Sequence, residues 1–204
     1  MAVYTDVSFE DLEKLLTEYD IGSPRSFKGI AEGVENSNFH LQTERGGYIL
    51  TLYEKRVSAD DLPFFLGLME HLATRGIDCP QPVRNRAGKN SIVLNGRPAA
   101  LLTFLDGVSL RKPDVMHCAQ AGEALARLHA AGADFKPTRR NALGVAGWKN
   151  LAADTRANAD SVQAGLAALI ETTLHEMNEW PTTLPTGIIH ADLFPDNVLF
   201  IGGK

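Results

Sequence analysis

The residues best suited to chemistry stand near the end of the chain. In the segment Gly187–Phe200, His190 is followed two residues later by Asp192, and Asn197 follows five residues after that. A carboxylate accepts the proton of an attacking hydroxyl, and an amide oxygen binds Mg²⁺ without placing another negative charge beside phosphates. The spacing therefore favours phosphoryl transfer, with Asp192 as the base, Asn197 as a metal ligand and His190 holding the loop by hydrogen bonding.

The same spacing is typical of the catalytic loop of kinases, in which His-x-Asp is followed after four residues by Asn. Three such residues at fixed positions arise by chance in about one per cent of chains of this length. The apolar residues on either side, Ile188-Ile189 and Val198–Ile201, predict two short strands that frame the loop. The alternative interpretation is a solvated Asx turn around Pro195.

A second candidate site is the glycine-containing turn that precedes residue 39. Main-chain N–H groups freed by glycine, together with a serine hydroxyl, can cradle the phosphates of a nucleotide. An ordinary hairpin turn also uses glycine and asparagine, so that interpretation stays open. The candidate nucleotide-binding residues in this turn are Gly29, Gly33, Asn36, Ser37 and Asn38.

A third candidate is the segment Leu102–Gly107, which begins within the last predicted strand of the N-terminal half and continues as the connector. Its main chain at Thr103, Phe104 and Leu105 is placed to meet the edge of an adenine ring. A plain edge strand explains the same residues equally well.

Periodicity places these candidates on a β-rich half and a helical half. Capping signals, apolar spacing and the Gly46-Gly47 and Asn95-Gly96 turns mark the boundaries of the elements. A cleft beside the connector between the halves is where a ligand is expected. The predicted helices span 8–20, 60–75, 114–131, 148–158 and 160–179, and the predicted strands span 26–31, 37–43, 48–53, 91–94 and 98–105.

The composition excludes several classes of function. Twenty Lys and Arg residues against 25 Asp and Glu give a formal net charge of -5, which leaves no positive excess for binding nucleic acid. The two cysteines, Cys79 and Cys118, form no CxxC pair, so neither a zinc site nor a disulfide is predicted. The chain has no signal-peptide pattern and no apolar stretch that could span a membrane, so we expect a cytoplasmic protein.

With these residues in place, the chain resembles the aminoglycoside phosphotransferase and choline kinase superfamily of small-molecule kinases. Within it, the ensemble of motifs is most similar to the bacterial homoserine kinases. The matching pieces span nearly the whole chain and are Gly29-x-x-x-Gly33-x-Glu35-Asn36-x-Asn38, Tyr48–Lys55, Gly122–His129, Asn141–Gly144 with Trp148, and His190–Asn197.

The resemblance implies an α+β, protein-kinase-like fold with two lobes. Residues 1–104 are expected to form a nucleotide-binding antiparallel β N-lobe with one crossing helix. Residues 105–204 are expected to form a mostly helical C-lobe that carries the catalytic loop and is truncated at its C-terminus. The implied activity is ATP- and Mg²⁺-dependent phosphorylation of the hydroxyl of L-homoserine, a step toward threonine, with no nucleic-acid or membrane partner.

Three departures from the family pattern stand out. Thr51 occupies the place of the usual third-strand lysine, with Lys55 as a substitute on the same strand face. The usual helix glutamate is also absent, because Leu66 stands near its place and Glu70 comes later. The family's second metal ligand, an aspartate, would follow residue 204, so we expect little or no turnover from these 204 residues alone.

Two alternatives to a homoserine kinase stay open at this point. One is a kinase of another small alcohol, of the choline or aminoglycoside type. The other is a nucleotide-binding module that keeps the fold without turnover. The absent third-strand lysine and the absent metal-binding aspartate favour it, whereas the intact Asp192 and Asn197 oppose it. Arg139, Arg140 and Asn141, with Trp148, are candidates for holding an amino-acid substrate.

Overall fold

The computed structural model describes residues 4–31, 35–54, 59–177, 181 and 183–202 of the chain. By their contacts these residues fall into two compact units. The first unit comprises residues 1–137 together with 187–204, and the second comprises residues 138–186. The segment that carries His190, Asp192 and Asn197 therefore belongs to the same unit as the N-terminal sheet.

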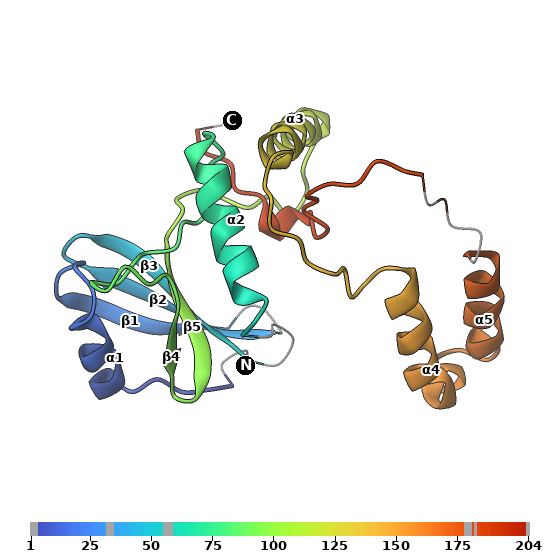
Figure 1. Cartoon of the computed structure of the whole chain (residues 1–204), viewed down its shortest axis with the longest axis horizontal. Helices are drawn as coiled ribbons and strands as arrows, with labels where there is room; N and C mark the ends of the chain where they lie inside the picture. Colours follow the sequence, from blue (N-terminus) through green and yellow to red (C-terminus); the bar gives the residue numbers. More distant parts are fainter. Residues whose placement is uncertain (1–3, 32–34, 55–58, 178–180, 182, 203–204) are drawn as a thin grey trace. The chain divides into compact units, whose positions relative to one another are not determined.

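An antiparallel five-stranded sheet in the order β1-β2-β3-β5-β4 forms the centre of the first unit (Figure 1). Residues of β2 alternate between half-buried and buried, which is the period of a strand with one fully covered face. The β4–β5 hairpin turns at Asn95 and Gly96, whose φ angles of 50° and 75° suit a type I′ turn. The predicted sheet is confirmed, with the bounds β1 Pro24–Ile30, β2 Asn36–Thr43, β3 Gly46–Tyr53, β4 Ile92–Leu94 and β5 Arg97–Thr103.

Helix α1 (Phe9–Leu16) covers one face of this sheet (Figure 1). It begins at the predicted capping box, in which Ser8 Oγ accepts a hydrogen bond from the Asp11 N–H and an Asp11 carboxylate oxygen accepts one from the Ser8 N–H, both at 3.1 Å. Leu12 and Leu15 on the inner side of the helix are buried in the main apolar cluster. The sheet contributes Phe39, Leu41, Leu50, Leu52, Ala99 and Leu101 to that cluster.

Helix α2 (Leu62–Thr74) packs on a second apolar cluster formed by the opposite face of the sheet. Pro63 stands in its first turn, where a missing N–H costs no helical hydrogen bond. Leu62 and Leu66 are buried against Tyr53, Ala100 and Leu102 of the sheet. The crossing helix predicted for the N-terminal half is therefore confirmed.

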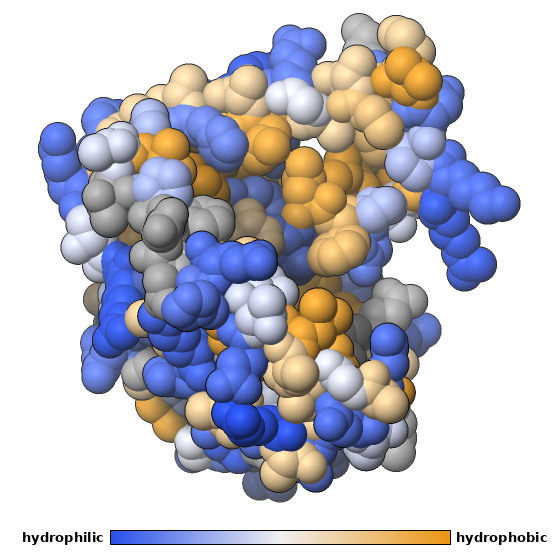
Figure 2. Space-filling model, turned by 90° about the vertical axis from the view of Figure 1, so that its right-hand side faces the viewer, coloured by the Kyte–Doolittle hydropathy of each residue, from blue (hydrophilic) through white to orange (hydrophobic). Residues whose placement is uncertain are grey.

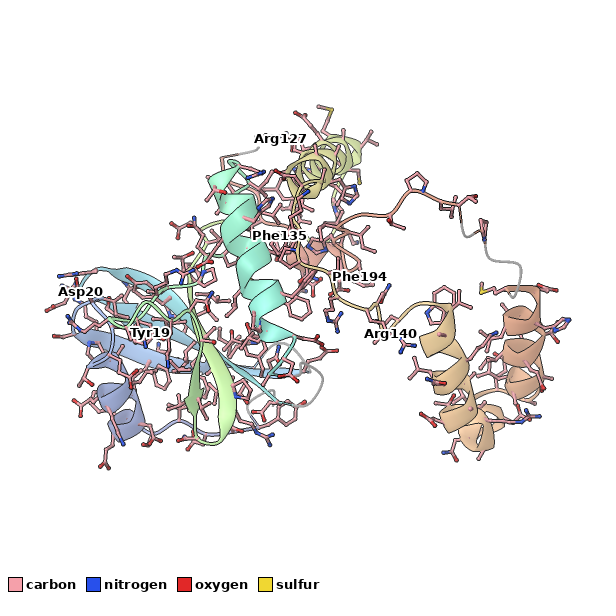
Figure 3. The ribbon with its side chains drawn as sticks, viewed as in Figure 1. Tyr19, Asp20, Arg127, Phe135, Arg140 and Phe194 are labelled. Atoms are coloured by element: carbon pink, nitrogen blue, oxygen red, sulfur yellow. The ribbon has the colours of Figure 1, made fainter. Side chains whose placement is uncertain are left out.

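Helix α3 (Val115–Gly132) follows the connector and contacts α2 through its C-terminal end. The ring of Phe135, labelled in Figure 3, lies against the rings of Phe64 and His71 of α2. His71 Nε2 also donates to the Ala131 carbonyl at 3.1 Å, and Arg75 forms an ion pair with Asp134. These contacts join the sheet's covering helix to the end of α3.

The second unit is a helical hairpin of α4 (Val145–Val162) and α5 (Leu166–Glu176). The predicted start of the last helix at Asp160 is wrong, because the chain turns at Gly165, whose φ of 81° suits glycine. Asp160 lies inside α4, and its carboxylate accepts a hydrogen bond from the Ala167 N–H in the first turn of α5 at 2.9 Å. The break between the two helices therefore lies at residues 163–165 rather than at residue 159.

Helices α3, α4 and α5 have few buried residues compared with the sheet and with α1 and α2. Of the 18 residues of α3 only Gly132 is buried, and α5 has no buried residue. Figure 2 shows apolar residues, in orange, exposed on the side of the molecule that faces the viewer. Over all described residues, the large apolar side chains with the greatest exposure are Val115, Val93, Val162, Met116, Leu143 and Ile201. Within the described residues, no helix has the length and apolarity to cross a membrane.

Candidate functional site

The segment that carries His190, Asp192 and Asn197 is held at both ends by other parts of the first unit. Before it, Ile188 packs on Gly132 at the end of α3 so closely that a Cβ on the glycine would lie 3.0 Å from the Ile188 Cβ. After it, Phe200 and Val108 exchange two main-chain hydrogen bonds, both of 3.0 Å. The loop is therefore fixed beside the connector that follows β5.

Gly107 in the connector is required by this arrangement. Its φ is 147°, and a Cβ there would lie only 2.8 Å from the Leu199 Cβ. The ring of Phe200 meets His117 of α3 edge to face, with ring centroids 4.9 Å apart. Residues that are about ninety positions apart in the sequence are thus packed together around the candidate loop.

Inside the loop, the three predicted residues are bonded to one another. Asn197 Nδ2 donates to Asp192 Oδ2 at 3.0 Å and to the Asp192 carbonyl at 2.8 Å. The Asp192 N–H donates to His190 Nδ1 at 3.3 Å. The structure therefore brings the carboxylate and the amide together, and it leaves the second carboxylate oxygen of Asp192 and the Asn197 Oδ1 outside these bonds.

Ala191, between His190 and Asp192, adopts a φ of 66°, the left-handed region that non-glycine residues rarely enter. This conformation costs about 1 kcal/mol for an alanine. Strained backbone of this kind concentrates at functional sites. The sequence gives no sign of this strain, because alanine is not a residue type that favours a positive φ.

The strands predicted on either side of the loop do not form. Ile188 and Ile189 have no strand partner among the described residues, and Phe200 makes only an isolated bridge to Val108. Instead, Pro195–Asn197 form a turn of 3₁₀ helix, with Asn197 N–H donating to the Phe194 carbonyl at 2.9 Å. The prediction failed because a strand needs a neighbouring strand to accept its hydrogen bonds, which apolar composition alone does not provide.

The donor set at the loop fits Mg²⁺ only in part. The described residues hold no group of three or more His, Cys, Asp and Glu side chains that could bind a metal ion. The Asn197 Oδ1 is a hard oxygen of the type Mg²⁺ takes, and Mg²⁺ commonly completes its shell with substrate phosphates and water. Asp192, Asp196 and Asn197 are all exposed, so these oxygens are open to a ligand.

The second candidate, the turn between β1 and β2, is described at its edges only, and Gly33 lies outside the described residues. Gly29 is exposed and pairs with Phe39 across the two strands. Asn36 and Asn38 are half-buried on the α2 face of the sheet, and Asn38 Oδ1 accepts a hydrogen bond from the Thr51 hydroxyl at 2.9 Å.

Ser37 does not have the role that the sequence predicted. Its side chain is fully buried on the other face of β2. Its Oγ donates to Glu54 Oε1 at 2.6 Å and accepts from the N–H groups of Tyr4 at 2.8 Å and Thr5 at 3.1 Å. These bonds use the whole hydrogen-bonding capacity of the hydroxyl, so none is left for a phosphate.

Of the three connector residues predicted to bind adenine, two have their main-chain N–H groups in hydrogen bonds with other described residues. The Thr103 N–H donates to the Gln81 carbonyl at 2.9 Å, and the Phe104 N–H donates to the Gly47 carbonyl at 3.1 Å. Leu105 makes no main-chain hydrogen bond within the part of the chain that the structure describes. Phe104 is half-exposed, and its ring meets that of His40 edge to face at 5.0 Å.

The departures from the kinase pattern are visible in the contacts. Thr51 is buried and bonded to Asn38, and Leu66 faces the sheet within its apolar cluster. Glu70 is paired with Arg84 at 2.7 Å and so is engaged outside the sheet. Lys55 lies outside the described residues. A lysine and glutamate pair between α2 and β3 is therefore absent at the expected positions.

The candidates for substrate binding fall in the second unit. There, Asn141 Oδ1 accepts a hydrogen bond from the Leu143 N–H at 2.9 Å, in the turn that leads into α4. Arg139 and Arg140 precede that turn, and Trp148 stands in the first turn of α4.

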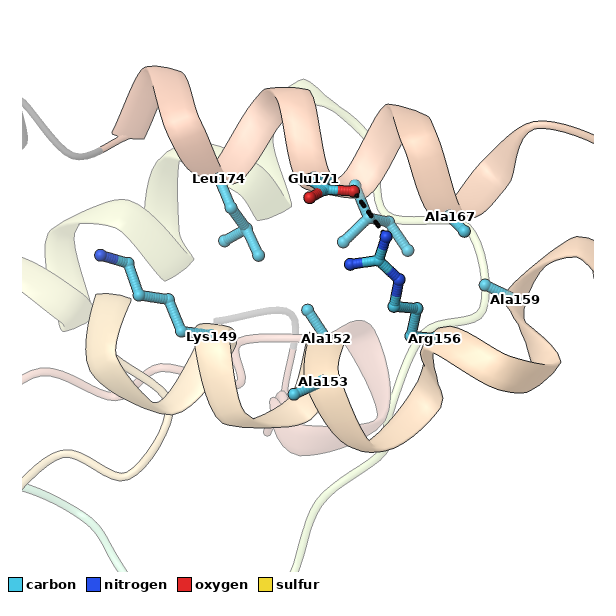
Figure 4. A pocket seen from close by; sticks show the side chains of 9 residues that line it. Lys149, Ala152, Ala153, Arg156, Ala159, Ala167, Glu171 and Leu174 are labelled. Atoms are coloured by element: carbon cyan, nitrogen blue, oxygen red, sulfur yellow. Dashed lines mark ion pairs between the residues drawn. The ribbon is translucent and has the colours of Figure 1, made fainter.

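A groove of about 220 Å³ lies between α4 and α5 of the second unit (Figure 4). Four alanines form much of its wall, and an ion pair between Arg156 and Glu171 at 3.1 Å crosses it. Small side chains leave such a gap wherever two helices pack, so the groove is a consequence of alanine packing. It contains none of the residues singled out from the sequence.

Comparison with known proteins places the chain. A model of a phosphotransferase enzyme family, APH, matches residues 26–204. The chain belongs to this family. The kinase-like fold has solved counterparts: spectinomycin phosphotransferase in complex with ADP and spectinomycin superimposes with a TM-score of 0.73 at 14% identity, over 98% of this chain and 67% of that one.

A second APH structure, solved with GDP and kanamycin, superimposes with a TM-score of 0.61 at 19% identity, over 94% of this chain and 67% of that one. Two curated relatives are much more similar in sequence. A homoserine kinase of Bradyrhizobium sp. strain ORS 278 is 62% identical over 203 residues, and one of Rhodospirillum rubrum is 63% identical over 202 residues. The matches cover 99% and 98% of this chain, which spans 63% of the length of each relative.

The structure also contains features that the sequence did not single out. Ala191 has a left-handed backbone, and Glu54 is a buried carboxylate paired with the partly exposed Arg97; none of the three was a candidate. For Glu54 a signal existed, because a charge two residues after buried Leu52 on the same strand face is expected to point inward.

Proposed function

We propose that this chain provides the nucleotide-binding and catalytic-loop parts of an ATP- and Mg²⁺-dependent L-homoserine kinase. The observation that carries the proposal is the bonded set of His190, Asp192 and Asn197 in an APH-family chain. The substrate is taken from the two homoserine kinases that are 62% and 63% identical. The division into an N-lobe of residues 1–104 and a C-lobe from residue 105 is part of the same proposal.

In the proposed mechanism, Asp192 accepts the proton of the homoserine side-chain hydroxyl as the oxygen attacks the γ-phosphorus of ATP. The bond from the γ-phosphorus to the bridging oxygen breaks, and ADP leaves with that electron pair. The Asn197 amide orients the carboxylate by donating to its Oδ2, which leaves the other carboxylate oxygen to take the proton. His190 holds the loop by accepting from the Asp192 N–H. Positioning of this type supplies much of the rate enhancement in phosphoryl transfer.

Asn197, through Oδ1, is the residue of this chain proposed to hold Mg²⁺, which when bound neutralises charge on the phosphates. The free main chain of Leu105 is proposed to bind the adenine edge, beside Thr103 and Phe104. Gly29, Asn36 and Asn38 are proposed to contact the phosphates from the β1–β2 turn, and the proposal for Gly33 rests on the sequence alone. Ser37 is left out because its hydroxyl is fully engaged.

The test compares two proteins, since the chain spans 63% of the relatives' length. One is the 204-residue chain, and the other is a fusion that adds the part of the Bradyrhizobium relative outside the match. Both are assayed for ADP release with L-homoserine, choline and kanamycin as acceptors. Turnover of the fusion with L-homoserine above the other two supports the proposal, and turnover with choline or kanamycin alone contradicts it.

Asp192→Asn in the fusion tests the base. Asparagine keeps an oxygen that can accept from Asn197 but takes up no proton, so we expect kcat to fall about 10²- to 10⁴-fold. Asp196→Asn is the matched control, because it neutralises an equally exposed carboxylate four residues away and should change kcat less than about tenfold. A loss below about tenfold for Asp192→Asn would count against its role as the base.

A further inference from the structure

A buried carboxylate lies beneath the start of β2, on the face of the sheet away from α2. Glu54 directly follows β3, and its side chain is only 3% exposed. One of its oxygens accepts from the Ser37 hydroxyl at 2.6 Å, and the other is paired with Arg97 Nε at 3.1 Å. Ser37 in turn holds the main chain of Tyr4 and Thr5. We refer to these five residues as the Glu54 network.

The network joins strand ends that surround the β1–β2 turn. Ser37 is the second residue of β2, Glu54 follows the last residue of β3, and Arg97 is the first residue of β5. A second contact reinforces the pairing, since Arg97 donates from its guanidinium to the Glu54 carbonyl at 3.2 Å. Three neighbouring strands and the N-terminal arm are therefore fixed at one point.

Ser37 also separates two residues of the candidate phosphate site. Asn36 and Asn38 flank it in β2 and face the opposite side of the sheet, because side chains alternate along a strand. A shift of the Ser37 main chain therefore moves both asparagines. The buried bonds on one face thus determine the position of two polar side chains on the other.

The charge of Glu54 is maintained inside the protein. Burial alone raises the pKa of a carboxyl group, but the hydrogen bonds from Ser37 and Thr5 and the charge of Arg97 together hold the pKa of Glu54 below its ordinary value. Buried ion pairs contribute little net stability compared with apolar packing, and fixing a unique geometry is one of their attested uses. Among the described residues, Glu54 at this strand end is the only buried carboxylate.

We propose that Glu54, held by Arg97, is a positioning residue that fixes the β1–β2 strand ends, and with them Asn36 and Asn38, for binding the phosphates of ATP. This inference rests on the proposed function, because it assumes that the turn binds nucleotide. In this proposal neither Glu54 nor Arg97 contacts ATP itself.

The test measures the Kd of the 204-residue chain for Mg-ATP by calorimetry, alongside thermal unfolding. Glu54→Gln keeps the shape and removes the charge, and Arg97→Gln removes the partner from a side chain that is 41% exposed and so is easier to replace. We expect each variant to bind ATP about tenfold more weakly, the weight of one hydrogen bond to a charged group. Arg97→Lys, which keeps the charge, should restore most of the affinity.

Arg45→Gln is the matched control. Arg45 pairs with Asp20 at 2.7 Å beside the β2–β3 turn, at the opposite end of the same strands. Its loss should lower stability without changing the Kd for ATP. In the fusion protein, Glu54→Gln and Arg97→Gln should raise the KM for ATP and leave the KM for L-homoserine unchanged, which general destabilisation does not do.

The outcomes separate the two proposals. Absence of Mg-ATP binding by the unsubstituted chain overturns the proposed function and this inference with it. Normal binding by the unsubstituted chain together with unchanged Kd in Arg97→Gln overturns the positioning role alone, and this variant decides the matter if Glu54→Gln does not fold. Equal weakening by Arg45→Gln also overturns it, because the effect then follows stability rather than the strand ends.

Discussion

The sheet of the first unit and the helical hairpin of the second differ in how much of their surface they bury. Leu12, Leu41, Leu50, Leu52 and Leu101 are fully buried around the sheet. Among the described residues between 138 and 186, only Ala159 is buried. The sheet therefore owes its stability to burial of apolar surface, whereas the hairpin depends on local helical hydrogen bonds and exposed pairs.

The more buried first unit is also the one that holds the candidate catalytic loop. The candidate loop belongs to the first unit and is tied down by Gly107 and Gly132, where close packing leaves no space for a Cβ. A reactive carboxylate needs such a rigid support to keep its geometry. The helical hairpin of the second unit has an alanine-lined groove but only one buried residue, Ala159, among its described residues.

The chain has its own reporters for the two units. Both tryptophans, Trp148 and Trp180, fall between residues 138 and 186, and all four tyrosines precede residue 54. Tryptophan fluorescence thus follows the second unit, and tyrosine absorbance follows the first. Comparing the unfolding transitions followed by tyrosine absorbance and by tryptophan fluorescence tests whether the difference in burial gives the two units different stabilities.

The largest expected effect is that of Leu50→Ala. Removing a fully buried leucine from the sheet should cost about 3 kcal/mol and lower the temperature of the tyrosine transition by about 10 °C. Leu169→Ala in α5 is the control, because this side chain is 59% exposed and its loss should cost less than about 0.5 kcal/mol. Equal effects on their respective transitions would mean that the hairpin has a core comparable to that of the sheet.

Much of the sheet was predictable because its signals are local. Ser8 and Asp11 bracket the first turn of α1, and Asn95-Gly96 marks the hairpin without any knowledge of the fold. Period-two burial in β2 likewise follows from the side-chain pattern. The same alternation places Ser37 with Phe39 on the buried face. The sequence pattern could therefore have predicted that the Ser37 hydroxyl points away from the phosphate site.

The candidate loop was predictable in its residues but not in its backbone. The spacing of His190, Asp192 and Asn197 indicated that they act together, and the structure brings them into hydrogen-bond contact. The strained φ of Ala191 and the 3₁₀ turn from Pro195 depend on packing against the connector. Interactions between residues far apart in the chain leave no local pattern, and for the same reason the flanking strands were predicted wrongly.

A middle-sized effect is expected from the cap of α1. Ser8→Ala removes the acceptor for the Asp11 N–H and should cost the first unit about 1 kcal/mol. The matched change in the hairpin is Ser161→Ala, whose hydroxyl donates only to Asn158 of its own helix at 2.6 Å. That change should cost less than about 0.5 kcal/mol. Urea titrations followed by the two sets of reporters measure both.

The smallest expected effect concerns the ion pair that joins α4 and α5. Arg156 and Glu171 are 67% and 65% exposed, so their attraction is screened by water, and Arg156→Gln should cost the second unit no more than about 0.5 kcal/mol. Salt at about 1 M should abolish even that difference, because it shortens the range of charge interactions to about 3 Å. Urea titrations of both proteins at low and high salt, followed by tryptophan fluorescence, measure the effect. A loss of about 2 kcal/mol that persists in high salt would show that the hairpin shields this pair from water, and the contrast with the buried sheet would then fail.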